Sequence, residues 1–165
     1  MMNSGSPNAL HRPGDDPGAR EKLVALRGAL LRLHKALLEM ERRDYEREHG
    51  VVNTGELFRL VVEDQQFNWL HNISEFVVRI DESLTGKSPV GPAEADTALD
   101  LARKIFTPTE AGDAFQKQYF AAIQRDPSVV MEHAELARLF SQTLPKETKL
   151  LPSTIGEHLQ SQRKR

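Results

Sequence analysis

The stretch from Ala19 to His49, AREKLVALRGALLRLHKALLEMERRDYEREH, decides the fold class of this chain. Apolar side chains recur along it at spacings of three and four residues, at Leu23, Leu26, Leu30, Leu33, Leu37 and Met40. That spacing gathers them on one side of an α-helix, so the stretch predicts one long amphipathic helix. Gly50 follows directly, and we expect it to end this helix in the left-handed conformation.

Further helices are predicted after Gly50, because capping residues, prolines and glycines divide the sequence into short amphipathic segments. Asn53 and Glu56 have the spacing of a capping box at the start of the second helix. Residues 63–66 interrupt the apolar pattern, so a kink or a short turn is expected there. The later helices are predicted over 67–84, 92–106, 110–124 and 127–141, the last one capped by Asp126.

No segment alternates apolar and polar residues with the period of two that marks a half-buried strand. The predicted fold class is therefore all-α, an irregular helical bundle of about five or six helices around the long N-terminal helix. We assign residues 19–141 to a single helical-bundle domain. Residues 1–18 predict a flexible leader rich in Gly, Pro, Ser, Asn and Asp. Residues 142–165 predict a polar, mobile C-terminal tail, in which Thr154 and Glu157 could start one more short helix.

The composition restricts the classes of function. Hydrophobic residues make up 39% of the chain and charged residues 28%, which is typical of a soluble globular protein. The net charge of -2 gives no basic field, so no nucleic-acid partner is expected. The absence of cysteine excludes disulfides, thiolate metal sites and cysteine nucleophiles. The N-terminal residues show no apolar signal-peptide core, and no window approaches the roughly 18 apolar residues that cross a bilayer. We therefore expect a cytoplasmic protein without membrane contact.

Several polar side chains fall on helix faces that should point inward when each helix is drawn at about 100° per residue. They are Arg27, His34 and Glu41 of the first helix, Ser74 and Asp81 of the third, and His133 of the last. A buried ionisable group is costly unless it is paired or bound to a metal. The first interpretation is a structural polar network, for instance Arg27 with Asp81, that fixes the register of the helices.

The alternative interpretation is a metal site inside the bundle, because helical bundles build such sites from facing side chains. His34 and His133 would supply nitrogen ligands, and Glu41 or Asp81 would supply oxygen ligands. The Glu-x-x-His motif, which di-iron bundles carry on two helices, occurs here at Glu46–His49 alone. The His-Glu-x-x-His motif of zinc hydrolases is absent. No cofactor is therefore expected, and a metal remains the alternative.

Recognisable enzyme signatures are missing from the sequence. It contains no Gly-x-Ser-x-Gly elbow, no phosphate-binding glycine loop and no dinucleotide fingerprint. Trp69 lies at the margin of its helix's apolar arc, where we expect a half-buried core residue, with an interface anchor as the alternative. His71 and Glu75 lie four residues apart on the polar face, which predicts an ordinary surface pair.

Short blocks of the central sequence resemble a known group of proteins. The blocks are Leu33–Leu38, Tyr45–Glu46, Gly55–Leu57, Gln66–Leu70 and Ile80–Glu82. They are similar to a group of small uncharacterised bacterial all-helical proteins with no established activity, and the resemblance covers about Leu23 to Phe140. It implies a bacterial, cytoplasmic, all-helical protein, and it carries no catalytic residue over to this chain.

The leading functional hypothesis is a non-enzymatic helical bundle that binds either to itself or to a protein partner. The apolar arc of the first helix looks wide enough to serve both an internal core and a second surface. The alternative from another class is a bundle that binds a metal or a small ligand through His34, His133, Glu41 and Asp81. That alternative requires the four side chains to converge.

Overall fold

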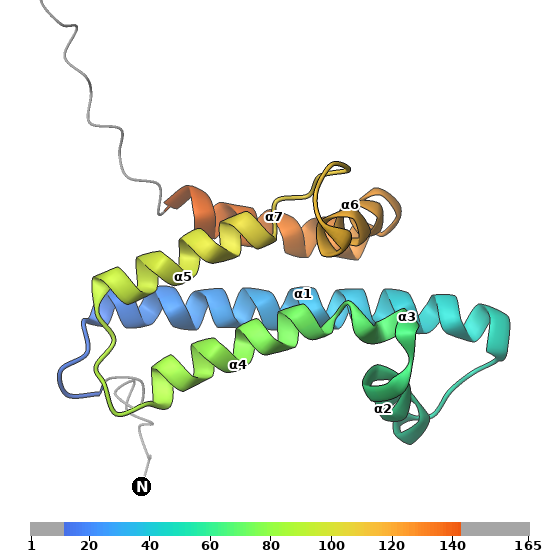
Figure 1. Ribbon diagram of the computed structural model, residues 1–165, viewed down its shortest axis with the longest axis horizontal. Coiled ribbons are helices and arrows are strands. Elements are labelled where there is room, and N and C mark those ends of the chain that lie inside the picture. Colours follow the sequence, from blue (N-terminus) through green and yellow to red (C-terminus); the bar gives the residue numbers. More distant parts are fainter. Residues whose placement is uncertain (1–11, 143–165) are drawn as a thin grey trace, which may run out of the picture.

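The computed structural model describes residues 12–142, and in this range it contains seven α-helices and no strand (Figure 1). The helices are α1 (Pro17–His49), α2 (Thr54–Glu63), α3 (Gln65–Asn68), α4 (His71–Thr85), α5 (Pro92–Ile105), α6 (Ala114–Arg125) and α7 (Pro127–Gln142). The predicted all-α fold with a long N-terminal helix is confirmed.

The ends of α1 follow from a proline and a glycine. Pro17 lies in the first turn, where its missing N–H leaves no helical bond unmade, so α1 begins two residues before the predicted Ala19. Gly50 ends the helix with φ 87°, and its N–H donates to the carbonyl oxygen of Glu46. The predicted positive φ is confirmed, but ψ is 169°, so Gly50 is not in the left-handed helical conformation. This geometry leads the chain away from α1 toward α2 (Figure 1).

The starts of α2 and α7 agree with the prediction. Asn53 and Glu56 form the capping box, with both side-chain-to-backbone hydrogen bonds present. Asp126 caps α7, since its Oδ1 accepts the N–H of Ser128 at 2.9 Å.

The helix predicted over 67–84 is wrong at its N-terminal end. The expected interruption within 63–66 is present, because Asp64 ends α2 and starts the single turn of α3. A second interruption at Trp69 and Leu70 separates α3 from α4 and raises the number of helices above the five or six expected. It allows Phe67 and Leu70 to be completely buried while the indole of Trp69 reaches Glu41 of α1.

The start of α6 also differs from the prediction. Asp113 and Gln116 form a second capping box, so α6 begins at Ala114 rather than near Glu110. The capping box satisfies two N–H groups at once, and this local gain outweighs the helix-forming tendency of Glu110.

α1 runs through the middle of the bundle, with α4 along one side and α5 and α7 along the other (Figure 1). Its inward leucines are completely buried, as at Leu26 and Leu33. Rings at the end of α5 and in α6 pack edge to face, with the centroids of Phe106 and Phe115 5.6 Å apart. α2 projects from the bundle beside α3, and Leu60 is its one fully buried side chain (Figure 1). α2 is therefore the least covered helix in residues 12–142.

Parts of the predicted leader and tail lie outside the described range. They are residues 1–11 and 143–165, which include the short helix expected at Thr154 and Glu157. The remaining leader residues have defined contacts, as shown by Asp15, whose side chain is buried. Between residues 12 and 142, no helix is both long and apolar enough to cross a membrane.

Candidate functional site

The polar residues predicted on the inward face of α1 all find partners on α3 and α4. Arg27 pairs with Asp81, His34 with Ser74, and Glu41 with side chains of α3 and its C-cap residue Trp69. The three α1 residues are spaced seven apart, and their α4 partners are spaced seven apart in the reverse order. α1 and α4 are therefore antiparallel, with one polar crossing every two turns. We call these three crossings the polar seam.

The two crossings with α4 lie at the solvent edge of the seam rather than inside it. Arg27 and Asp81 form the predicted ion pair, yet their side chains keep 40% and 41% of their surface exposed. His34 Nε2 lies 3.2 Å from the hydroxyl oxygen of Ser74, which is exposed. Partial burial lowers the pKa of His34, and the positive charge of nearby His71 adds to this shift. The prediction of inward-pointing side chains is thus wrong for the exposed Ser74, and Arg27 and Asp81 are only half-buried.

Glu41 is the one buried member of the seam, with 7% of its surface exposed. Its Oε2 accepts a hydrogen bond from Gln66 Nε2 at 2.8 Å, and its Oε1 accepts one from Trp69 Nε1 at 3.2 Å. Arg125 Nη2 of α6 lies 3.6 Å from Oε1 and supplies a positive charge. Trp69 also packs against Phe115, with ring centroids 5.6 Å apart. Trp69 therefore serves the interior, and the structure gives no support to its alternative role as an interface anchor.

His133 lies on the opposite side of α1 from the polar seam. Its Nδ1 is 2.6 Å from the hydroxyl oxygen of Tyr119 in α6. Burial lowers the pKa of His133 and raises the pKa of Tyr119, so both groups are held neutral. His133 thus faces α6 while His34 faces α4, and the four candidate ligands do not converge. Within residues 12–142, no group of three or more His, Asp and Glu side chains is placed to hold a metal ion.

Asp15 is a buried polar residue, although the sequence predicted it as part of the flexible leader. It accepts the N–H of Val90 at 2.8 Å and a hydrogen bond from Arg20 Nη1, also at 2.8 Å. These contacts lower the pKa of Asp15, the hydrogen bond from the Val90 N–H being the largest cause. The signal in the sequence was the pair Asp15–Asp16 before Pro17, a pattern typical of a helix start.

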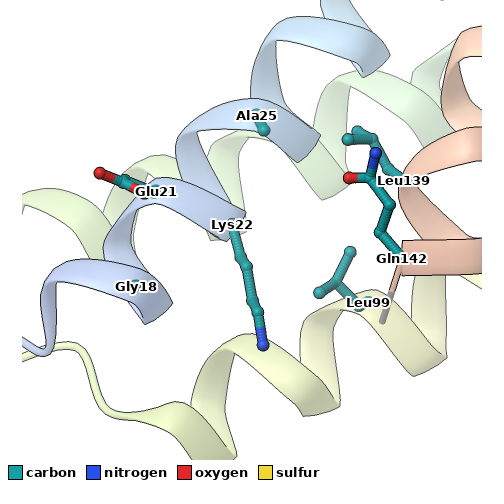
Figure 2. Close-up of a pocket in the computed structure, with 7 residues that line it drawn as sticks. All are labelled: Gly18, Glu21, Lys22, Ala25, Leu99, Leu139 and Gln142. Carbon is teal, nitrogen blue, oxygen red and sulfur yellow. The ribbon is translucent and has the colours of Figure 1, made fainter. Parts of the chain in front are cut away.

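One surface hollow, of about 330 Å³, lies between α1, α5 and α7 (Figure 2). It is lined by Gly18, Glu21, Lys22, Ala25, Leu99, Leu139 and Gln142. Lys22 extends from α1 toward α5, where its Nζ lies 3.5 Å from Asp96 (Figure 2). The hollow is mostly apolar, and its cation already has a carboxylate partner.

A larger hollow, of about 580 Å³, lies between α2 and α4, and we call it the α2–α4 groove. It is lined by Val61, His71, Ser74, Glu75, Val78, Arg79 and Glu82. His71 Nε2 lies 2.8 Å from the carbonyl oxygen of Val61 and so holds α2 against the start of α4. The predicted surface pair of His71 with Glu75 is not formed, because the imidazole turns to α2 instead.

Exposed apolar side chains occur on both helices that form the α2–α4 groove. Phe58 exposes 72% of its surface, Val62 57% and Val78 54%. On α2, Phe58 is three residues before Val61 and four before Val62, so these side chains lie next to one another. We call Phe58, Val62 and the groove together the α2–α4 face. The second apolar surface predicted for α1 is smaller, since Leu31 there exposes 40% and Val24 and Leu38 are half-buried.

Comparison with known proteins assigns no role to these residues. No protein-family model matches the sequence, and no curated protein or solved structure matches it either.

Proposed function

We propose that this protein is a non-enzymatic helical module that binds another protein molecule through the α2–α4 face. The observation that carries the proposal is the exposure of Phe58 and Val62 on α2, which contributes Val61 to the groove, and of Val78 within the groove. Single exposed apolar residues are normal in folded proteins, but contiguous apolar surface beside a hollow marks interaction sites.

The position of α2 supports this proposal. α2 has ten residues, too few for a stable isolated helix in water, and its one fully buried side chain is Leu60. A second protein that covers Phe58 and Val62 would bury the outer side of α2 as well. This arrangement corresponds to recognition of an amphipathic helix by a groove, in which apolar anchors three and four residues apart supply the affinity.

The charges around the face favour a protein over a nucleic acid. The exposed charged residues that line its groove are the acidic Glu75 and Glu82 and the basic Arg79. The acidic excess would repel phosphate groups, whereas mixed charges suit a polar rim around an apolar protein interface. The proposed setting is the cytoplasm, as the sequence analysis expects.

Site-specific photocrosslinking in cells of the native host tests the proposal. A benzophenone amino acid replaces Phe58 in one variant and Met131 of α7 in the control, because these two side chains are equally exposed at 72% and 71%. The expected result is a discrete crosslinked protein band from position 58 and none from position 131. No band at position 58, or equal bands at both positions, would contradict the proposal.

A further inference from the structure

Tyr119 of α6 is fully buried, and its hydroxyl group has a single hydrogen-bond partner among residues 12–142. That partner is Nδ1 of His133 in α7, which lies 2.6 Å from the hydroxyl oxygen. A buried hydroxyl hydrogen without an acceptor is costly, so the Tyr119 O–H donates and Nδ1 accepts. The imidazole proton therefore lies on Nε2, and neutral histidine makes this contact.

Protonation of His133 reverses the direction of this hydrogen bond. Both ring nitrogens of the imidazolium ion donate and neither accepts. The Tyr119 oxygen can still accept from Nδ1, but its own hydrogen then has no acceptor among the described residues. The phenol ring packs against Phe106 and Phe115, with centroids 5.8 and 5.9 Å away, and none of its surface reaches water. Protonation therefore leaves a buried hydroxyl hydrogen unpaired.

Charged side chains on the surrounding helices do not offset this cost. The residues three and four positions away from His133 on α7 and from Tyr119 on α6 are uncharged: Val129, Val130, Leu136, Ala137, Phe115, Gln116, Ala122 and Ile123. The two carboxylates nearest to His133 along α7 pair elsewhere, Glu132 with Arg32 of α1 and Glu135 with Arg138. Arg103 of α5 reaches Asp100 and the carbonyl oxygen of Phe140. Burial is accordingly the cause of the lowered pKa of His133.

α6 is the helix that can respond, because it lies at the periphery of the bundle. It packs mainly on α7, whereas α7 also packs on α1 and α5 (Figure 1). Its other connections are the ion pair of Arg125 with Asp44 and the contact of Phe115 with Trp69. When α6 opens, water can satisfy both the hydroxyl group and the imidazolium ion. Protonation therefore stabilises an open position of α6 relative to the docked one.

We infer that the Tyr119–His133 hydrogen bond is a pH-sensitive switch, which holds α6 on the bundle while His133 is neutral and favours its opening once His133 is protonated. The pKa of His133 is below 6.5 in the folded chain, so opening increases as the pH falls from about 6.5 through that pKa. An open α6 uncovers the aromatic rings that Phe115 and Tyr119 now cover, among them Trp69 and Phe106. This switch is separate from the α2–α4 face.

Amide hydrogen exchange of the full chain between about pH 7.5 and 5, a window around the ordinary pKa of histidine, tests the inference. After correction for the intrinsic exchange rate, we expect the protection of the α6 amides to fall about fivefold or more, as for one buried hydroxyl left unpaired. The central amides of α1 are expected to stay better protected than α6 at every pH. The midpoint of the fall is expected to match the pKa of His133 in an NMR titration of its ring protons.

Two asparagine variants separate His133 from other titrating groups. His133→Asn places an amide oxygen near the position of Nδ1, where it can accept the Tyr119 O–H without titrating. Its α6 protection is expected to be independent of pH. His34→Asn is the matched control, because His34 is also a half-buried histidine with a lowered pKa but faces α4. It is expected to keep the pH dependence of the wild-type chain.

The inference is overturned by constant α6 protection across the pH range, or by a midpoint that differs from the pKa of His133. It is also overturned if the pH dependence persists in His133→Asn or disappears in His34→Asn as well. Exchange of the central α1 amides as fast as that of α6 would mean that the whole chain unfolds, which leaves no switch. None of these outcomes decides the proposed function, which depends on the crosslink at position 58.

Discussion

Replacing Phe58 with alanine separates binding from folding, because the side chain is large and contacts little of its own chain. Phe58 exposes 72% of its surface, so it adds little to the folded state of the monomer. We expect Phe58→Ala to change the free energy of unfolding by no more than about 0.5 kcal/mol, the usual range for surface substitutions.

The effect on binding at the α2–α4 face follows from the same exposed fraction. Full burial of a phenylalanine side chain stabilises by about 1.5–3 kcal/mol, so burial of the exposed 72% is worth about 1–2 kcal/mol. Because about 1.4 kcal/mol corresponds to a factor of ten, the dissociation constant of the protein bound at the α2–α4 face is expected to rise roughly 5- to 30-fold.

Titration calorimetry with the protein that the crosslink at position 58 identifies measures the dissociation constant, and thermal unfolding of the full chain alone checks the fold. Met131→Ala is the matched control, because Met131 exposes 71% of its surface on α7, away from the α2–α4 face. An equal loss of binding in both variants would refute the assigned face. A large fall in the melting temperature of Phe58→Ala would refute the assumption that this side chain does not stabilise the fold.

Three further substitutions test the interior and the polar seam. Glu41→Leu removes the buried acceptor of the hydrogen bonds from Gln66 Nε2 and Trp69 Nε1, so urea denaturation should show a loss of about 1–3 kcal/mol in the free energy of unfolding. Glu48→Leu, at an exposed position of α1, is the control. Equal urea midpoints for the two variants would contradict this account. The side chains of Arg27 and Asp81 are 40% and 41% exposed, so a double-mutant cycle with alanine should give a coupling energy below about 1 kcal/mol. A coupling energy of several kcal/mol would mean that solvent does not screen the pair. The pKa of His133 lies below 6.5 in the folded chain, so its contribution to stability is complete above pH 6.5 and is lost as the pH falls from there through the folded pKa. His133→Asn should therefore flatten the fall in stability below pH 6.5, and an unchanged slope would assign that fall to other groups.

Local elements were well predicted from the sequence where one residue type fixes the backbone. The capping box of Asn53 and Glu56 and the cap formed by Asp126 are present as expected, because each satisfies N–H groups within four residues of itself. The break between α3 and α4 was not predictable in this way. No glycine or proline marks this break. It allows Phe67 and Leu70 to be buried while Trp69 donates a hydrogen bond to Glu41 of α1.

The candidate site was predictable only in part. The ion pair of Arg27 with Asp81 was expected, because both lie near apolar arcs and have opposite charge. The partners of Glu41 were not expected, since Gln66 and Trp69 lie in a segment whose break the sequence did not show. The α2–α4 face was missed as well. Phe58 and Val62 follow apolar periodicity, and periodicity alone cannot show that no other helix covers them.

The sequence by itself determined that this chain forms helices, where most of them begin and end, and which residues line the side of α1 that is buried. These properties depend on interactions between residues within about four positions of one another, and the sequence shows which residues those are. The tertiary structure alone decided that His34 and His133 face different helices and that α2 stays largely uncovered. Such contacts join residues far apart in the sequence, as with Arg27 and Asp81 at a separation of 54, and they depend on how all the core side chains pack at once.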